Sequence, residues 1–231
     1  MKRVAIVQSN YVPWKGYFDL INSVDEFILY DDRQYTRRDW RNRNRIKTAQ
    51  GPRWLTVPVA AKGRYTQRID ETRVSDLSWV ERHWRTISVN YAAAPFFHEY
   101  SAALETLYVG CHEELLSLVN RQFLSEICAI LGISTPLTSA SDYHAVGDAT
   151  ERLVALCRAA GATHYLSGPA ARAYIDPESF EEAGIELEYF DYSGYPEYEQ
   201  LYPPFEHTVT IIDLIVSVGA EAPRFMKSFG P

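Results

Sequence analysis

The stretch Arg3–Asp32, RVAIVQSNYVPWKGYFDLINSVDEFILYDD, decides the fold of this 231-residue chain. Its first apolar run, residues 3–7, is short and rich in β-branched side chains, which is typical of a strand. Residues 14–24 place apolar side chains at helical spacing directly after Pro13, so a helix is expected to begin there. Residues 26–30 predict a second strand. A strand, a helix and a strand in this order form a βαβ unit, which implies parallel strands and a right-handed crossover.

The same alternation of strands and helices returns in the second half of the chain. Residues 163–167 and 185–189 predict strands, and residues 148–160 predict a helix that ends at a glycine. The middle of the chain predicts three helices over residues 78–91, 96–108 and 112–131, a helical subregion at about 78–132. Because no linker or repeat divides the sequence, residues 1–231 are expected to form one domain. The predicted fold is α/β, with a mostly parallel sheet, flanking helices and a helical insertion in the middle.

Four further segments have a local pattern that predicts their structure. Residues 54–59 predict a strand, which residues 46–47 could join as a hairpin. Residues 60–76 are polar and are expected to form an exposed loop and a mobile flap. Residues 190–205, rich in tyrosine, predict a long ordered loop. Residues 209–218 predict a buried helix in which Asp213 is expected either to anchor an arginine or lysine of the site or to cap nearby backbone, because an unpaired buried carboxylate is costly.

The composition indicates an acidic, globular protein. Lysine and arginine number 23 against 30 aspartate and glutamate residues, which gives a formal net charge of -7 and a pI near 5.4. Cys111, Cys128 and Cys157 are an odd number without Cys-x-x-Cys spacing, so buried reduced thiols are expected rather than disulfides or a zinc site. No segment is long and apolar enough for a signal peptide or a membrane span. A cytoplasmic location without membrane insertion is the expectation.

Two unusual loops follow the first two predicted strands. Residues 8–15 follow the first strand, and residues 31–47 follow the second. In open α/β sheets ligands bind beyond the carboxyl ends of the strands, so both loops are expected to border one site. The second loop, DDRQYTRRDWRNRNRIK, holds six arginines and one lysine in an otherwise acidic chain. It therefore predicts an anion-binding segment.

This arginine-rich segment allows two interpretations. As a helix over residues 34–47 it could present a solvated charged face. The interleaved Trp40, Asn42 and Asn44 favour instead a segment whose side chains grip a flat or phosphorylated ligand. Nucleic-acid binding exploits a broad basic surface, which a chain of this pI lacks, so a small phosphorylated or nucleotide-linked ligand is expected rather than a nucleic acid.

Three groups in the sequence could carry chemistry. Asp31 and Asp32 at a strand end are placed either to bind Mg²⁺ with a phosphate or to hold arginines of the loop in position. His83 is the best histidine candidate for acid–base work because it titrates near neutrality, although a lone helical histidine is more often structural. Ser167 and Gly168 form a turn whose backbone amides could approach a ligand. The chain contains no Walker A loop, Gly-x-Ser-x-Gly motif or dinucleotide fingerprint.

The order of several motifs strongly resembles the WbqC-like family over nearly the whole chain. These motifs are QSNYVPWKGYF (residues 8–18), DDRQYTRRDWRNRNRIK (31–47), WLTVPV (54–59), HWRTISVNY (83–91), GATHYLSGP (161–169) and TIIDLIVSVG (210–219). The resemblance implies a bacterial protein of O-antigen or other surface-polysaccharide biosynthesis, in which some members are suspected of attaching an amino acid to an amino sugar. It implies an amide-forming transferase or ligase that acts on an amino-bearing sugar, either phosphorylated or nucleotide-linked.

The resemblance also implies that the motif residues converge on one site. The expected catalytic residues are His83 and Asp32. The expected substrate- and anion-binding residues are Gln8, Tyr11, Trp14, Lys15, Asp31, Arg38, Arg41, Asn42, Arg43, Arg45, Lys47, Asn90, Tyr91, Ser167 and Gly168. ATP or another nucleotide with Mg²⁺ is the cofactor that such a reaction could use, and a homo-oligomer is compatible with the sequence. The alternative is a non-catalytic protein that binds or carries a nucleotide-sugar or another phosphometabolite.

Overall fold

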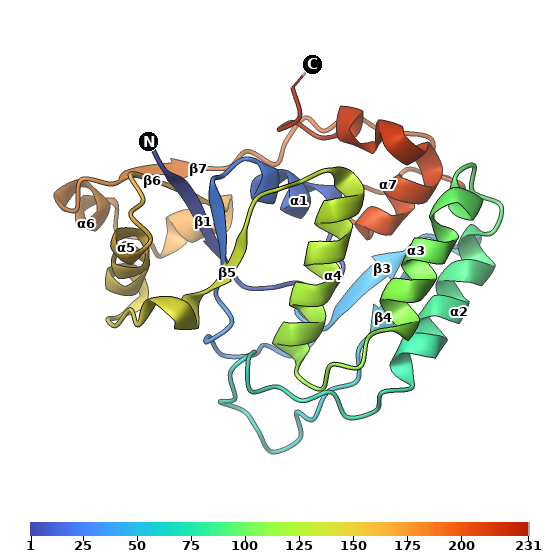
Figure 1. The fold of residues 1–231 in the computed structure, drawn as a ribbon, viewed down its shortest axis with the longest axis horizontal. Coiled ribbons are helices and arrows are strands. Elements are labelled where there is room, and N and C mark those ends of the chain that lie inside the picture. The colour runs from blue at the N-terminus through green and yellow to red at the C-terminus, as the bar shows by residue number, and fades with distance from the viewer. Residues whose placement is uncertain (231) are drawn as a thin grey trace.

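A five-stranded parallel sheet forms the centre of the molecule (Figure 1). The structure is a computed structural model, and it describes residues 1–230. The strands lie in the order β5-β2-β1-β6-β7, and every neighbouring pair is parallel. Their bounds are Arg3–Val7 for β1, Glu26–Leu29 for β2, Leu137–Ser139 for β5, His164–Ser167 for β6 and Glu186–Tyr189 for β7. The first strand of the chain therefore lies in the middle of the sheet, between β2 and β6.

Helices cover both faces of this sheet. The helix α1 (Lys15–Asn22) packs on one face, whereas α5 (Ala149–Ala159) and α6 (Pro177–Glu182) pack on the other. Successive side chains of a strand point to opposite faces, so Ala5 of β1 joins the core beside α1 and Val4 joins the core beside α5. The chain is thus an α/β protein with a mostly parallel, doubly covered sheet, which confirms the predicted fold class.

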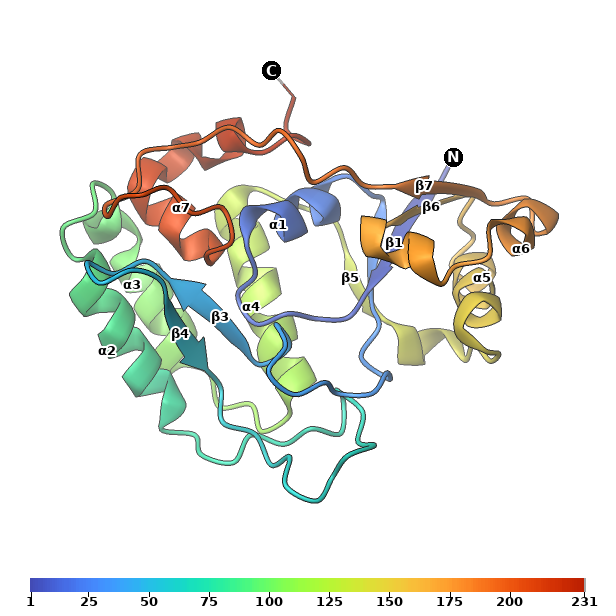
Figure 2. The same cartoon turned by 180° about the vertical axis from the view of Figure 1, so that it is seen from behind.

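The helical insertion and a β-hairpin form a second region beside the sheet (Figure 2). Its helices are α2 (Trp79–Tyr91), α3 (Phe97–Val109) and α4 (Leu116–Leu131), joined by α7 (Ile211–Val218) near the end of the chain. The hairpin consists of β3 (Arg43–Ile46) and β4 (Arg53–Thr56), which pair antiparallel. Three short 3-10 helices span Ala140–Tyr143, Pro169–Ala173 and Gly219–Phe225. Apolar side chains of α1 and of all four helices of the insertion region share one core.

The arginine-rich segment is a strand at its end and not a helix. Asn42, Asn44 and Ile46 are buried, whereas Arg43 and Arg45 between them are partly exposed. This alternation has the two-residue period of a strand, so the interpretation of residues 34–47 as a solvated helix is wrong. The predicted hairpin with the segment around Trp54 is confirmed.

The polar loop over residues 60–76 is tied to the rest of the molecule by backbone hydrogen bonds. The amide of Asp70 donates to the carbonyl of Asp31 at 2.9 Å, and the amide of Leu116 donates to the carbonyl of Thr72 at 2.8 Å. The amide of Val74 also donates to the carbonyl of Glu114 at 2.8 Å. Since the residues before Leu116 pair with this loop, α4 begins at Leu116 and not at residue 112 as predicted.

The three cysteines are buried and free. Burial raises the pKa of the Cys128 and Cys157 thiols to about 12, so both are protonated at neutral pH. Among residues 1–230, no helix combines the length and the apolar character that a bilayer crossing requires.

Candidate functional site

A cavity of about 400 Å³ opens at the carboxyl ends of β1, β2 and β6. We call it the strand-end cavity; its lining includes Gln8, Tyr30, Arg33, Arg41, Ser167 and Tyr192. The chain winds outward from β1 in one direction through β2 and β5, and in the other through β6 and β7. Ligands of open α/β sheets bind in the crevice at such a reversal of strand order. The cavity therefore occupies the position at which this type of sheet binds small molecules.

Two guanidinium groups form a cationic wall of the strand-end cavity. Arg41 donates to the carbonyl of Gln8 at 3.3 Å and to the side-chain oxygen of Asn10, and its Nε is buried without a hydrogen-bond partner. Arg33 donates to Asp32 at 3.3 Å, and its guanidinium lies 4.6 Å from the ring centroid of Tyr30. Both cations are held by neighbouring groups, so little side-chain entropy remains to be lost when an anion binds.

The rest of the lining presents tyrosine rings and small side chains. Tyr30, Tyr165, Tyr174 and Tyr192 contribute rings, and alanines of α5 and of the 3-10 helix after Gly168 line the rest. The hydroxyl of Tyr30 is buried without a hydrogen-bond partner. Burial is the main cause that raises its pKa, so this hydroxyl stays protonated at neutral pH.

Asp31 and Asp32 lie next to this cavity, and their contacts are with amide and guanidinium groups. Asp31 is buried, and its carboxylate accepts from the amide of Ser9 at 2.8 Å. Burial is the main cause that raises its pKa to about 6. Asp32 accepts from Arg33 and from Arg152 of α5. Asp31 therefore holds a backbone amide, and Asp32 holds Arg33 and Arg152 where the sequence predicted Arg37, Arg38 or Arg41.

Within residues 1–230, one group of side chains has the spacing of metal ligands, and it lies elsewhere. His164, Glu186 and Glu188 bring one ligand atom each within 4.8 Å of one another. His164 and Glu186 begin β6 and β7, so this group lies toward the amino ends of the strands, away from the strand-end cavity. Arg3 already donates to Glu188 at 2.8 Å.

His83 lies in an aromatic core behind the hairpin and lines neither of the two cavities described in this section. Its Nδ1 is 2.8 Å from the hydroxyl of Tyr11, which in turn donates to Tyr108 at 3.1 Å. Both His83 and Tyr11 are buried, and Trp79 packs against both rings. Burial is the main cause that lowers the pKa of His83 to about 4, so the imidazole is neutral at pH 7. Its position and its pKa are those of a structural histidine.

The stability of the protein is expected to fall in acid because of His83. The folded protein holds its pKa near 4 and the unfolded chain titrates near 6.5, so between these values the unfolded state binds more protons. About 3 kcal/mol of unfolding free energy is present above pH 6.5 and is lost progressively as the pH falls to 4. Urea unfolding of wild type and His83→Gln across this range measures the effect. A constant difference between the two proteins would contradict a buried neutral imidazole.

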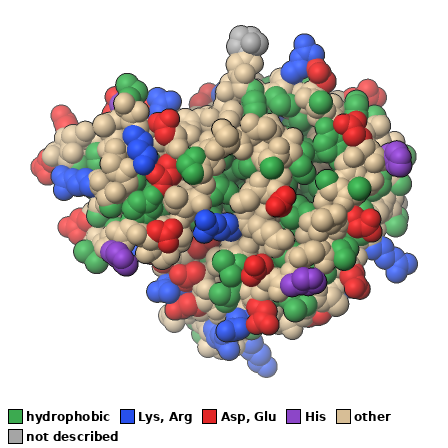
Figure 3. All heavy atoms as spheres, viewed as in Figure 1, with side chains coloured by type: hydrophobic (Ala, Val, Ile, Leu, Met, Phe, Trp, Pro, Cys, Tyr) green, Lys and Arg blue, Asp and Glu red, His purple; other side chains and the backbone are tan. Residues whose placement is uncertain are grey.

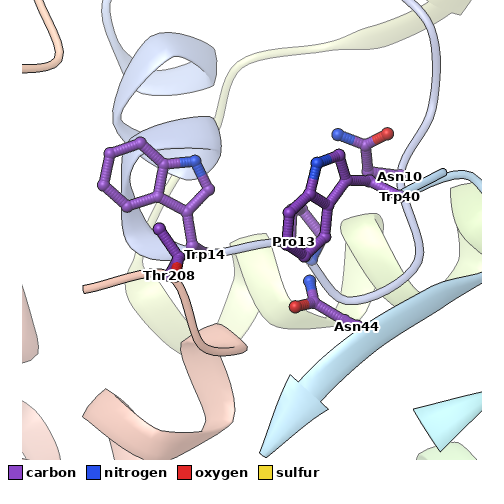
Figure 4. A pocket seen from close by; sticks show the side chains of 6 residues that line it. All are labelled: Asn10, Pro13, Trp14, Trp40, Asn44 and Thr208. Atoms are coloured by element: carbon purple, nitrogen blue, oxygen red, sulfur yellow. The ribbon is translucent and has the colours of Figure 1, made fainter. Parts of the chain in front are cut away.

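A second cavity of about 240 Å³ lies between two tryptophans (Figure 4). We call it the tryptophan cleft; it is lined by Asn10, Pro13, Trp14, Trp40, Asn44 and Thr208. The ring centroids of Trp14 and Tyr192 are 5.5 Å apart, and Tyr192 also lines the strand-end cavity. The side chain of Asn10 accepts from Arg41 of that cavity. The loop over residues 8–14 is therefore a wall shared by the two cavities.

The shared wall is held in a strained conformation. Val12 has φ of 38°, in the left-handed region that a β-branched residue rarely adopts. The buried side chain of Asn44 donates to the carbonyls of Tyr11 at 3.2 Å and Val12 at 2.8 Å. The amide of Tyr11 donates to the carbonyl of Trp40 at 3.0 Å. Strain of this kind persists only where the surroundings fix the backbone, and it is concentrated at functional loops.

Replacement of Asn44 by alanine is expected to destabilise the protein by about 2–3 kcal/mol. The substitution leaves two carbonyls of the strained loop without their donor, at a position that is 3% exposed. Thermal or urea unfolding measures the loss, with Gln50→Ala as the matched control, because Gln50 is exposed in the turn of the same hairpin. The control is expected to stay within about 0.5 kcal/mol of wild type. Equal stability of the two variants would show that Asn44 does not hold the loop.

Comparison with known proteins agrees with the sequence motifs. The model of the WbqC-like protein family matches residues 8–225. The chain belongs to this family. It is 54% identical over 227 residues to "Uncharacterized protein Rv1507c" of Mycobacterium tuberculosis, and the match covers 98% of each chain. No solved structure matches the chain.

The structure of this WbqC-like protein divides the predicted site residues into groups. Gln8, Arg41, Ser167 and Gly168 line the strand-end cavity, and Trp14 lines the tryptophan cleft. Arg43 stacks over Trp54, 4.1 Å from the ring centroid, and Arg45 lies 5.6 Å from that centroid. Arg38 is exposed, with φ of 58°, and its carbonyl accepts from Arg43.

Other predicted site residues brace the interior. Lys15 donates to the carbonyl of Pro196 at 2.7 Å, and Lys47 donates to the carbonyl of Pro204, so both lysines hold the late tyrosine-rich loop. Burial lowers the pKa of Lys15 to about 8. Three further predicted site residues make hydrogen bonds within the protein. Asn42 donates to the carbonyl of Val57, Asn90 donates to the carbonyl of Thr86, and Tyr91 donates to Asp213.

Several lining residues of the WbqC-like site were not among the predicted site residues. They are Asn10, Tyr30, Arg33, Tyr174 and Thr208. Tyr30 and Arg33 flank the aspartates at the end of β2, so the strand-end rule could have found them. Trp40, which interrupts the arginine run, and Tyr192 of the late tyrosine-rich loop were both indicated by the sequence as ring contacts for a ligand, and both line a cavity. Thr208 and Tyr174 come from distant segments, and no local pattern marks them.

Proposed function

We propose that this WbqC-like protein is an enzyme that binds a phosphorylated or nucleotide-linked amino sugar in the strand-end cavity and attaches an acyl or aminoacyl group to it. The observation that carries the ligand class is the pair of braced guanidinium groups, Arg33 and Arg41, at the reversal point of the sheet. The amide-forming reaction rests on the family resemblance and on the place of such sugars in surface-polysaccharide biosynthesis.

The cavity suits a phosphate group on a small molecule. Guanidinium groups bind phosphate through charge-assisted hydrogen bonds, and Arg33 and Arg41 bring two of them to the lining of the cavity. On the face seen in Figure 3, Lys and Arg side chains are interspersed with Asp and Glu side chains. That face therefore offers no continuous basic track to a polymer.

The proposed reaction forms one bond and breaks one. The amine nitrogen of the sugar attacks the acyl carbon of the donor, the C–N bond forms, and the leaving group departs with the electron pair of its bond to carbon. The proton of the amine passes to water or to a neighbouring base. The part of the protein in this step is to hold the amine in position and to neutralise negative charge through Arg33 and Arg41. His83 lines neither cavity and is not assigned a role in it.

A non-catalytic carrier of the same ligand is the second candidate. It is favoured by one observation: among the residues of the described chain, 1–230, that line the strand-end cavity, none is a carboxylate or an imidazole. A carrier needs phosphate and ring contacts, whereas an enzyme needs a titratable group within reach of the bound amine. Asp32, one contact away through Arg33, is the residue that separates the two candidates.

The test of the proposed function is a thermal-shift screen followed by a turnover assay. The screen covers nucleotides, nucleotide-sugars and amino acids, each with and without Mg²⁺. Phosphorylated compounds are expected to raise Tm, since a ligand at about 100 times its Kd adds about 2.7 kcal/mol of stability. Compounds that bind are then incubated with activated acyl donors, and mass spectrometry detects the acylated amine. Asp32→Asn is expected to keep binding and to lose turnover. No shift with any phosphorylated compound would refute the proposal, and binding without turnover would favour the carrier.

A further inference from the structure

We infer that the tryptophan cleft is a sugar subsite, in which a single pyranose ring packs on Trp14 and Trp40 while its phosphate reaches Arg41 across the shared wall. The phosphate half of this inference rests on the proposed function, whereas the sugar half rests on the cleft itself. This inference makes the proposed ligand more specific. The protein would bind the sugar ring in the cleft and the phosphate of the same ligand in the strand-end cavity.

One exposed and one partly buried aromatic ring build the cleft. Trp40 is 37% exposed, although a ring of this size is usually buried unless it serves an interface or a ligand. Trp14 lies on the other side of the gap, and Pro13 is a further lining residue (Figure 4). A pyranose presents an apolar face of C–H groups, and indole rings provide the flat apolar surface against which such a face packs.

The edges of the same rings offer hydrogen-bond donors. Figure 4 shows the indole nitrogens of Trp14 and Trp40 on the ring edges that border the gap. The side chain of Asn10 uses its oxygen to accept from Arg41, which leaves its amide nitrogen for a ligand. A cleft with apolar ring faces and N–H donors at its border suits a ligand that has apolar faces and hydroxyl acceptors on its rim. A sugar has both properties.

The hydroxyl side chain of Thr208 borders the cleft on its other side. Arg45 lies behind this border: it donates to Thr208, and its guanidinium is 5.9 Å from the ring centroid of Trp40. Glu206, 3.6 Å from Arg45, balances part of its charge. Asn44, in contrast, uses its amide for the strained loop and its oxygen for the amide of Arg45, at 2.7 Å. Asn44 therefore shapes the cleft and leaves ligand contacts to Asn10, Thr208 and the two indoles.

One pair of residues in contact links the lining of the cleft to that of the strand-end cavity. Asn10 lines the cleft and contacts Arg41, which lines the cavity. The volume of about 240 Å³ suits one ring, whereas the neighbouring volume of about 400 Å³ suits a larger part of a nucleotide. A sugar joined to a diphosphate would place its anomeric oxygen near this shared wall.

The experiment is fluorine NMR of the full chain labelled with 5-fluorotryptophan, which places one reporter on each of its five tryptophans. The variants Trp14→Phe and Trp40→Phe assign the two cleft signals. Trp79 and Trp84 pack in the aromatic core and serve as internal references. The probes are the methyl glycosides of glucosamine and N-acetylglucosamine, the diphosphates UDP, GDP and dTDP, and the hexose conjugates of these diphosphates.

We expect the Trp14 and Trp40 signals to shift with the glycosides and with at least one hexose conjugate, but not with the diphosphates. Trp40→Ala is expected to weaken binding of that conjugate about three- to tenfold and to change diphosphate binding less than twofold. Shifts at the cleft with diphosphates as large as those with their conjugates would overturn the sugar assignment in favour of the base or phosphates. No cleft shift with any sugar-bearing probe would also overturn it.

The two proposals fail in different ways in this experiment. If a conjugate binds through Arg41 and the cleft signals stay fixed, the sugar subsite is wrong and the proposed function stands. If glycosides shift the cleft signals and no phosphorylated probe binds the protein, the cleft stands as a sugar site and the phosphate-binding part of the proposed function is wrong.

Discussion

Replacement of Arg41 by alanine is expected to weaken the binding of a phosphorylated ligand by about 10- to 100-fold. This range corresponds to the loss of a charge-assisted hydrogen bond, about 1.5–3 kcal/mol. Arg41 has the most enclosed guanidinium of the strand-end cavity, with a side chain that is 15% exposed, and its Nε has no protein partner. Isothermal titration calorimetry with the best compound of the thermal-shift screen measures the change in Kd.

Two controls make the Arg41 result interpretable. Arg158→Ala removes an exposed arginine at the end of α5 and is expected to leave Kd unchanged. Arg41→Lys keeps the charge but not the planar fork, so its affinity should lie between wild type and Arg41→Ala. The melting temperature of each variant reports whether the loop over residues 8–14 is intact. Equal affinity of folded Arg41→Ala and wild type would remove the basis of the anion site.

Replacement of Asp213 by alanine is expected to lower the free energy of unfolding by about 3–5 kcal/mol. The carboxylate is fully buried in α7 and accepts from Tyr91 at 2.9 Å, from Tyr198 at 2.7 Å and from Gln200 at 2.8 Å. Alanine leaves three buried donors without an acceptor, and each unmet donor costs about 1–3 kcal/mol. Urea unfolding at neutral pH measures the loss.

The controls for Asp213 separate hydrogen bonding from charge. Glu105→Ala removes an exposed carboxylate on α3 and should change stability by less than about 0.5 kcal/mol. Asp213→Asn keeps one oxygen acceptor and is expected to lose less than Asp213→Ala. Because burial raises the pKa of Asp213, a neutral amide also avoids the charge that the interior disfavours. A loss below about 1 kcal/mol for Asp213→Ala would contradict the network.

The fold could be predicted from the sequence because its strands and helices carry their own local pattern. Residues 3–7 and 26–30 are apolar runs that the sheet buries on both faces, and β1 and β2 occupy them almost to the residue. Pro13 marked the start of α1, and Gly132, with φ of 74°, ends α4. These signals act within a few residues, so one sequence is enough to find them.

The position of the site could be predicted from the sequence, but the set of side chains that line it could not. The strand-end rule brought the loops after β1, β2 and β6 together, and Gln8, Arg41 and Ser167 do line one cavity. Which arginines face it depends on distant partners. Asp32 is paired with Arg152, 120 residues away, and Lys15 is held by the carbonyl of Pro196, 181 residues away. Such pairs follow from tertiary packing, and no local pattern encodes them.

The role of His83 could not be predicted from the sequence for the same reason. A histidine beside a tryptophan on a helix can be a catalytic residue or a buried core residue. The two roles differ in the groups that surround the imidazole. Its neighbour Tyr11 comes from the loop after β1, 72 residues earlier. The hydroxyl of Tyr11 and the ring of Trp79 enclose the imidazole. The surroundings that bury it and lower its pKa therefore come only in part from its own helix, through Trp79, and in part from the distant loop that carries Tyr11.

The central place of β1 has a consequence for the order in which the protein can be made. Its partner β2 is complete soon after β1 is synthesised, whereas its other partner, β6, begins at His164. Until that segment leaves the ribosome, β1 is an open edge that can pair with other chains. A nascent chain that stalls before His164 carries this edge and half of the strand-end cavity. Synthesis of the last third of the protein thus protects the first strand and completes the site in the same step.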